Sequence, residues 1–244
     1  MKHTLTIFKR EFGGYFATPV AYVFIVIFLL LSGFLTFFFG RLYESGQATL
    51  VGFFFWHPWL YLFLIPALSM RLWAEERRSG TIELLMTLPI TPTQAILGKF
   101  LASWTFTGIA LLGTVPTWIT VNYLGDPDNW AILSAYLGSF FMAGGFLAAG
   151  CAVSAVTKNQ VIAFVISFVV CFVFVFIGYP PVLEFLSLWL PGGLVDTLSS
   201  FSFWTHFDTI QRGLLQGADF VFFASMIAFF LLLNGLVLEA RKAR

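Results

Sequence analysis

Long uncharged, apolar runs alternate along the chain with short charged segments. A helix rises about 1.5 Å per residue, so a run of about 18 residues can cross a hydrocarbon core of about 30 Å. The runs that reach this length are Val20 to Phe39, Phe53 to Met70, Phe100 to Tyr123, Trp130 to Val156, Val161 to Tyr179 and Phe220 to Leu238. The pattern predicts an all-α, polytopic integral membrane protein with six transmembrane helices, in a single domain over residues 1–244.

Composition agrees with a membrane protein. Hydrophobic residues make up 59% of the chain and charged residues 10%, and the mean hydropathy is +0.90. A soluble domain has roughly 25% charged residues. The net charge of +1 and the lack of a basic stripe give no sign of nucleic-acid binding. Cys151 and Cys171 both lie in apolar runs and are interpreted as small residues that face lipid or another helix rather than as a disulfide pair.

The positions of the basic residues predict the orientation. With six spans and a cytoplasmic N-terminus, only Arg41 and Arg212 of the 13 lysines and arginines fall on the outer side. The positive-inside rule therefore places both the N-terminus and the C-terminus in the cytoplasm.

The first nineteen residues predict a helix that lies on the inner surface of the membrane. The apolar positions with helical spacing are Leu5, Phe8, Phe12 and Tyr15. Lys9 and Arg10 would lie near anionic lipid headgroups, and Pro19 ends the pattern. The alternative is that this segment is only a basic flank that sets the topology.

The segment from Tyr179 to Asp219 is too apolar for a free loop. Prolines and glycines divide it at Pro180, Pro181, Pro191, Gly192 and Gly193. We therefore expect broken helices at the outer interface, with Trp189 and Trp204 as interfacial anchors.

Five charged side chains gather between Trp73 and Gln94 in the segment WAEERRSGTIELLMTLPITPTQ. The spacing predicts that helix continues out of the second span and is interrupted at Gly80. A short cytoplasmic helix, Ile82 to Thr87, then follows with Thr81 as its N-cap and Glu83 in its first turn. A capping box, with Thr91 at the N-cap and Gln94 three residues later, opens the third span.

Two interpretations of this charged segment are open. It is either a helical connection that rests on the chain's own interfacial helix, or a docking element for a soluble subunit. In the second case Glu75, Glu76 and Glu83 pair with basic residues, while leucine and methionine side chains fill a groove.

The stretch MRLWAEERRSGTIELLMTLPITPTQAILGKF resembles the coupling segment of ABC-2 type permeases, in particular the group that includes gliding-motility permeases and the copper-maturation permeases of nitrous oxide respiration. The stretches FKREFGGYFATPVAYVF and FSFWTHFDTIQRGLLQGADFVFF are similar to that group as well. The resemblance thus covers essentially the whole chain.

The resemblance implies a permease subunit of an ABC transporter in the bacterial cytoplasmic (inner) membrane. ATP and Mg²⁺ would be held by a separate ATP-binding subunit, so this chain binds no cofactor, and two permeases would form a homodimer or heterodimer. The implied ATPase-coupling residues are Glu75, Glu76, Arg77, Arg78, Gly80, Thr81, Glu83 and Leu85. The implied outer-segment motif is His206, Phe207, Arg212 and Gly213.

Several motifs are absent from the sequence. There is no G-x-x-x-x-G-K-[ST] phosphate-binding loop, and His3, His57 and His206 lack metal-ligand spacing. The cores of the six predicted spans carry no charge, which disfavours an ion-driven carrier. Two alternatives to export remain: a scaffold that transmits force to an extracytoplasmic protein through residues 179–219, and a membrane enzyme that uses His206, Asp208 and Arg212.

Overall fold

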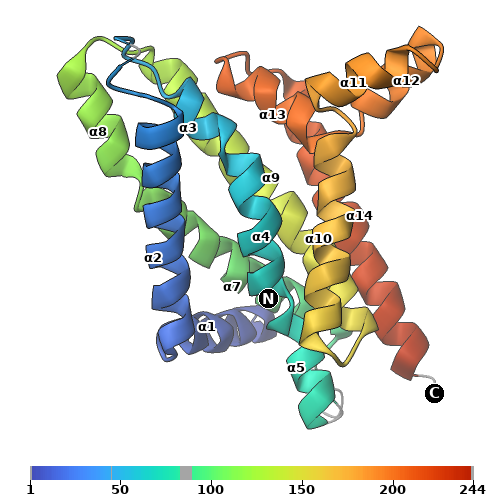
Figure 1. Ribbon diagram of the computed structural model, residues 1–244. Coiled ribbons are helices and arrows are strands. Elements are labelled where there is room, and N and C mark those ends of the chain that lie inside the picture. Colours follow the sequence, from blue (N-terminus) through green and yellow to red (C-terminus); the bar gives the residue numbers. More distant parts are fainter. Residues whose placement is uncertain (1, 45, 83–89, 243–244) are drawn as a thin grey trace.

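A computed structural model describes residues 2–44, 46–82 and 90–242 (Figure 1). Every regular element in these ranges is a helix. In chain order the elements are α1 (Lys2–Phe16), α2 (Pro19–Phe34), the π-helical turn η1 (Leu35–Phe39), α3 (Val51–Phe55), α4 (His57–Ser69), α5 (Arg71–Ser79), α7 (Pro92–Leu112), α8 (Val115–Leu124), α9 (Asn129–Val156), α10 (Gln160–Phe176), α11 (Pro180–Ser187), α12 (Gly192–Ser199), α13 (Phe203–Gln211) and α14 (Gly217–Lys242).

The described helices confirm an all-α, polytopic membrane protein. Four stretches are long and apolar enough to cross a membrane, and these are Ala21–Phe39, Pro92–Leu124, Asn129–Val156 and Gly217–Ala240. A fifth is added if α10 and α11, which meet at 68°, count as one span. The predicted second span is divided between α3 and α4, each shorter than a span. The count of six therefore stays a prediction.

Helix α9 forms the centre of the bundle, and its small residues allow neighbouring helices to approach closely. A Cβ atom on Gly144 would lie 2.9 Å from side-chain atoms of both Trp104 and Ile227. A Cβ atom on Gly150 would lie 2.0 Å from Oγ of Ser69. The small residues of α9 thus serve helix contact.

Proline explains the break in the third span. Pro116 has no N–H group to donate to the carbonyl of Leu112, the residue at which α7 ends. The chain turns through Gly113 and Thr114 and resumes as α8 at Val115. The apolar run is thus one stretch made of two helices.

The two ends of the bundle differ in charge. Figure 1 shows α1, α5 and both chain termini at one end, and α8 with α11 to α13 at the other. The described basic residues that were predicted to be cytoplasmic belong to the first end, whereas Arg41 and Arg212 follow elements at the second. The grouping matches the predicted topology, and the side of the membrane that each end faces stays a prediction.

Helix α1 lies crosswise to α2 and packs against α7 (Figure 1). The face of α1 that packs against the protein includes Ile7, which the prediction left out and which is buried, whereas Leu5 is exposed. The cause is Gly98 of α7: a Cβ atom there would lie 2.7 Å from the Ile7 side chain, so its absence lets Ile7 pack into α7.

The outer segment folds into three short helices, and the first two begin at predicted breaks. Pro180 opens α11, and Pro191 precedes α12. Helix α13 differs from the expectation because it packs on α9 and buries Phe203 and Ile210. Trp204 is therefore not an interfacial anchor. It is 6% exposed and its ring packs against aromatic side chains of other elements, namely Phe55, Trp59 and Tyr179.

Candidate functional site

Helix α5 extends the chain beyond α4 at the charged end of the bundle, as the AEERR pattern predicted. Its first turn is held by Ser154 of α9. The Ser154 hydroxyl oxygen accepts hydrogen bonds from the backbone N–H groups of Trp73 and Ala74, each at 3.1 Å, and donates to the Met70 carbonyl at 2.9 Å. N–H groups in the first turn of a helix have no partner within the helix, so Ser154 caps α5 from a neighbouring helix.

A buried cation connects α5 to α1 and α7. Nζ of Lys99, on α7, lies 2.8 Å from Oε1 of Glu76 on α5 and 3.2 Å from Oε1 of Glu11 on α1. The Lys99 side chain is 3% exposed, and its ammonium lies 5.3 Å from the centre of the Trp73 ring. Because an unpaired buried ammonium is costly, the two carboxylates offset the cost of burying the Lys99 side chain.

Arg10 completes this group of charges. Its guanidinium lies 2.6 Å from Oε1 of Glu11 and 3.8 Å from Oε1 of Glu76. We call Arg10, Glu11, Glu76 and Lys99 the four-charge cluster. Burial raises the pKa of the Glu11 carboxyl, but attraction to Lys99 and Arg10 outweighs burial and holds that pKa below its usual value near 4.5.

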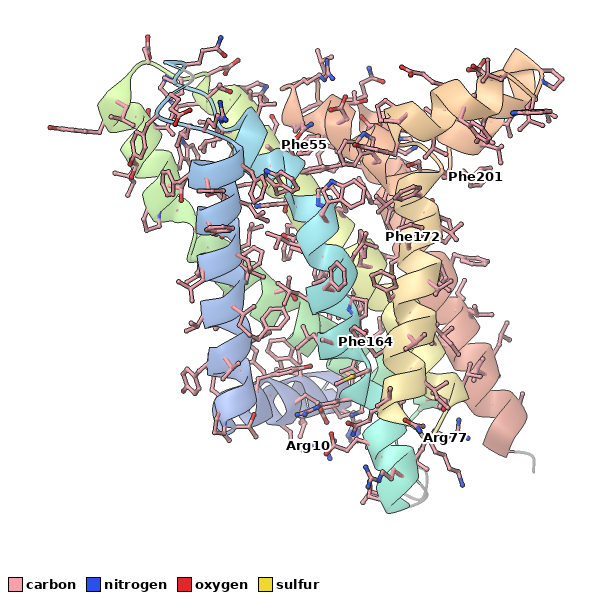
Figure 2. The ribbon with its side chains drawn as sticks, viewed as in Figure 1. Arg10, Phe55, Arg77, Phe164, Phe172 and Phe201 are labelled. Carbon is pink, nitrogen blue, oxygen red and sulfur yellow. The ribbon has the colours of Figure 1, made fainter. Side chains whose placement is uncertain are left out.

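Near its C-terminus α5 is hydrogen-bonded to α9, and the helix then ends at Gly80. The Arg77 guanidinium donates a hydrogen bond to the Ala155 carbonyl at the end of α9, and Figure 2 shows Arg77 at the same end of the bundle as Arg10. Gly80 ends α5 with φ of 74°, a left-handed conformation that glycine adopts without strain. The Thr81 hydroxyl lies 2.9 Å from Oγ of Ser79, so it faces back toward α5.

The outer-segment residues take structural roles at the opposite end. Nδ1 of His206 lies 2.6 Å from Oδ1 of Asp219, and its Nε2 lies 2.9 Å from the Ser200 carbonyl oxygen. Phe207 is buried. Arg212 forms an exposed ion pair with Asp208 at 2.8 Å, and Gly213 has φ of 80°. In the described ranges no three His, Cys, Asp or Glu side chains are grouped so that they could hold a metal ion.

Comparison with known proteins identifies the family. The family model of the ABC-2 family transporter protein matches residues 53–239. The chain belongs to the ABC-2 transporter family. It is therefore a multi-pass membrane subunit of a transporter rather than an enzyme itself. No curated protein matches the permease, and its resemblance to the gliding-motility and copper-maturation groups stays a prediction.

Six of the eight predicted coupling residues of the permease lie within the described ranges. Glu75, Glu76, Arg77 and Arg78 lie on α5, and Gly80 and Thr81 follow directly. Glu83, Leu85 and most of the predicted helix from Ile82 to Thr87 lie outside the described residues. The capping box is confirmed, since the backbone N–H of Gln94 donates to Oγ1 of Thr91 and the Thr91 N–H donates to Oε1 of Gln94.

Sequence reasoning missed two members of the four-charge cluster. From the sequence, Lys99 counts only as one of the basic residues on the cytoplasmic side, and Glu11 is given no role. A usable signal existed, because Lys99 is the one charged residue in the sequence from Pro92 to Leu112. A charge inside an apolar helix is costly, so it indicates an oppositely charged partner nearby.

Proposed function

We propose that this permease works with a separately encoded ATP-binding subunit, and that α5 with the segment after it receives the movement of that subunit and passes it into the membrane helices. The observation that carries this proposal is the attachment of α5 to three other helices. Glu76 joins it to α1 and α7 through Lys99 and Glu11, and Ser154 joins it to α9.

The physical basis is the cost of separating buried charges. Moving α5 away from α7 would leave Lys99 buried without its Glu76 partner, which is strongly unfavourable. Displacement of α5 is therefore expected to move α1 and α7 as well. The exposed side chains of Glu75 and Arg78 are available for charged contacts with the ATP-binding subunit.

The proposed assembly contains two permeases, identical or different, and two ATP-binding subunits in a bacterial cytoplasmic membrane. ATP and Mg²⁺ belong to the partner, which supplies the energy of hydrolysis. The contribution of this chain is mechanical: it receives displacement at α5 and repositions the spans for export of a substrate.

The test is purification of the tagged permease from its native membranes, with identification of co-purifying proteins that carry a G-x-x-x-x-G-K-[ST] loop. The ATPase activity of the complex is then measured. Gly80→Pro and Glu83→Lys are expected to release the ATP-binding subunit or abolish stimulated hydrolysis while the permease stays in the membrane. Glu44→Lys is the matched control, because Glu44 is exposed and lies between η1 and α3, and Figure 1 shows α3 at the opposite end. Normal coupling in both test variants would refute the proposal.

A second candidate function is force transmission to an extracytoplasmic auxiliary protein without movement of a solute. The surface formed by α11 and the turn after α11 favours this function, since Phe185, Leu188 and Trp189 are each more than half exposed. Site-specific crosslinking from Leu188 in native membranes tests it. Crosslinks to an outer protein, together with ATP hydrolysis but no flux, would favour this function, and crosslinks to lipid alone would exclude it.

A further inference from the structure

A cavity of about 1000 Å³ lies at the charged end of the bundle, between α1, α2, α4 and α5. This volume is at the upper end of the range of small-molecule sites. About half of its lining residues precede residue 53, where the family match begins. The site is therefore formed between the matched part of the chain and the two N-terminal helices.

The polar part of the cavity carries two charged side chains that are not used by the four-charge cluster. Arg71 and Glu75 both line the cavity and are one helical turn apart on α5. Both are exposed, and within the described ranges neither forms an ion pair. The cavity thus presents one available cation and one available anion side by side.

The other part of the cavity is apolar. Its walls are the first two turns of α2, from Ala21 to Ile27, and the last turns of α4, from Leu64 to Leu68. At about 1.5 Å per residue the wall on α2 is about 9 Å deep. Val23 and Ile27 are 53% and 39% exposed, so this wall is reached from the outside of the bundle.

We propose that this cavity binds one phospholipid of the adjoining leaflet, with a zwitterionic headgroup that carries a primary amine. The phosphate lies at Arg71, the ammonium donates hydrogen bonds to Glu75, and the upper part of an acyl chain lies along Val23, Ile27 and Leu64. The rest of the chain continues into the bilayer past α2.

The charges favour this lipid over others. Three cationic and three anionic side chains line the cavity, so an anionic headgroup gains no net attraction. A headgroup with both charges can pair with Arg71 and Glu75 at once. Charge-assisted hydrogen bonds from an ammonium require N–H groups, which a primary amine has and a quaternary amine lacks.

The orientation of the cavity also suits a phospholipid of the bilayer. Figure 1 shows α1 lying crosswise at the start of α2, and the charged lining residues Arg10 and Arg71 come from α1 and from the junction of α4 with α5. The apolar lining continues from there along α2 and α4. A lipid would occupy the site with its headgroup at the level of its neighbours in the bilayer.

The experiment uses the full-length permease in detergent, incubated with equimolar phosphatidylethanolamine, phosphatidylglycerol and phosphatidylcholine. Bound lipids are counted by native mass spectrometry. Phosphatidylethanolamine is expected to be retained over both competitors, and retention of either competitor to an equal or greater extent would overturn the proposal. The measurement requires no ATP-binding subunit, so its outcome is independent of the proposed coupling.

Three test variants and two controls assign the lipid to this cavity. Arg71→Gln and Glu75→Gln are expected to reduce retention by roughly tenfold each, because each removes a charge-assisted contact. Arg78→Gln, on the same helix but outside the lining, should retain lipid as the unmodified protein does. Ala67→Phe fills the cavity and should abolish retention, whereas Ala228→Phe places the same side chain on an exposed position of α14. Equal retention in Ala67→Phe and Ala228→Phe would show that the lipid is bound elsewhere and would refute the site.

Discussion

Nζ of Lys99 and Oε1 of Glu76 are 2.8 Å apart, and this contact joins the membrane helix α7 to α5, which carries most of the charges of the charged segment. The contact is made where the Lys99 side chain is almost completely buried. Removing one partner of this pair should destabilise the fold more than removing one partner of a surface ion pair, because the remaining charge would be buried without a counter-charge.

Replacing Lys99 by methionine should destabilise the permease by roughly 3 kcal/mol, the order expected when one partner of a buried ion pair is removed. The variant leaves the carboxylates of Glu11 and Glu76 close together without the cation between them. Thermal unfolding in detergent, followed by tryptophan fluorescence, measures the effect. The triple variant Lys99→Met, Glu11→Gln, Glu76→Gln should recover much of the loss. A single variant as stable as the unmodified protein would contradict the role of Lys99.

The contribution of Glu11 should depend on pH in a defined direction. The pKa of Glu11 is lower in the folded protein than its usual value. Its stabilising contribution is therefore present above the unfolded pKa and is lost as the pH falls through the folded pKa. The difference in unfolding temperature between the unmodified protein and Glu11→Gln should be largest near neutral pH and shrink in acid. A difference that grows on acidification would contradict this assignment.

Ser154→Ala should destabilise the permease by about 2 kcal/mol, because the N–H groups of Trp73 and Ala74 lose a buried acceptor. Ser225→Ala is the matched control. The Ser225 hydroxyl is exposed and donates only to the Phe222 carbonyl of its own helix, so its loss should change stability by less than about 0.5 kcal/mol. Unfolding temperatures of both variants give the comparison, and equal values would argue against capping by Ser154.

Gly150→Ala should destabilise by roughly 1 to 3 kcal/mol through overpacking. The added Cβ atom would lie 2.0 Å from Oγ and 2.7 Å from Cβ of Ser69, so α4 and α9 must separate. Gly33→Ala on α2 is the control, since no atom outside its own helical turn lies within 4 Å of the added Cβ atom. Alanine also favours the helix there, so that variant should be at least as stable as the unmodified protein. Equal destabilisation of both variants would contradict the close approach.

Features set by neighbouring residues could be predicted from the sequence. The capping box at Thr91 and the breaks at Pro180 and Pro191 depend on side chains within a few residues of each other, and the structure confirms them. The apolar runs likewise predicted the helical membrane architecture. The division of the second run between α3 and α4 was not evident from hydropathy, which reports apolar length and not helix continuity.

Features made by distant segments could not be predicted from spacing alone. The four-charge cluster brings together residues 10, 11, 76 and 99 from three helices. The burial of Trp204 depends on rings from Trp59 and Tyr179, and that of Ile7 on the missing side chain of Gly98. Each of these features depends on which helices pack together. Hydrophobic periodicity within one helix does not show which other helices it contacts.

The packing of α1 on α7 has a consequence for how the protein is made. Residues 2–16 leave the ribosome before the partners of Arg10 and Glu11, which are synthesised up to about ninety residues later. Helix α1 therefore cannot dock in its final position until α7 has been inserted into the membrane. Bulky sequences fused next to α1 are expected to interfere with this late docking and to leave Lys99 without its partner Glu11, so an affinity tag on this permease should be placed away from α1.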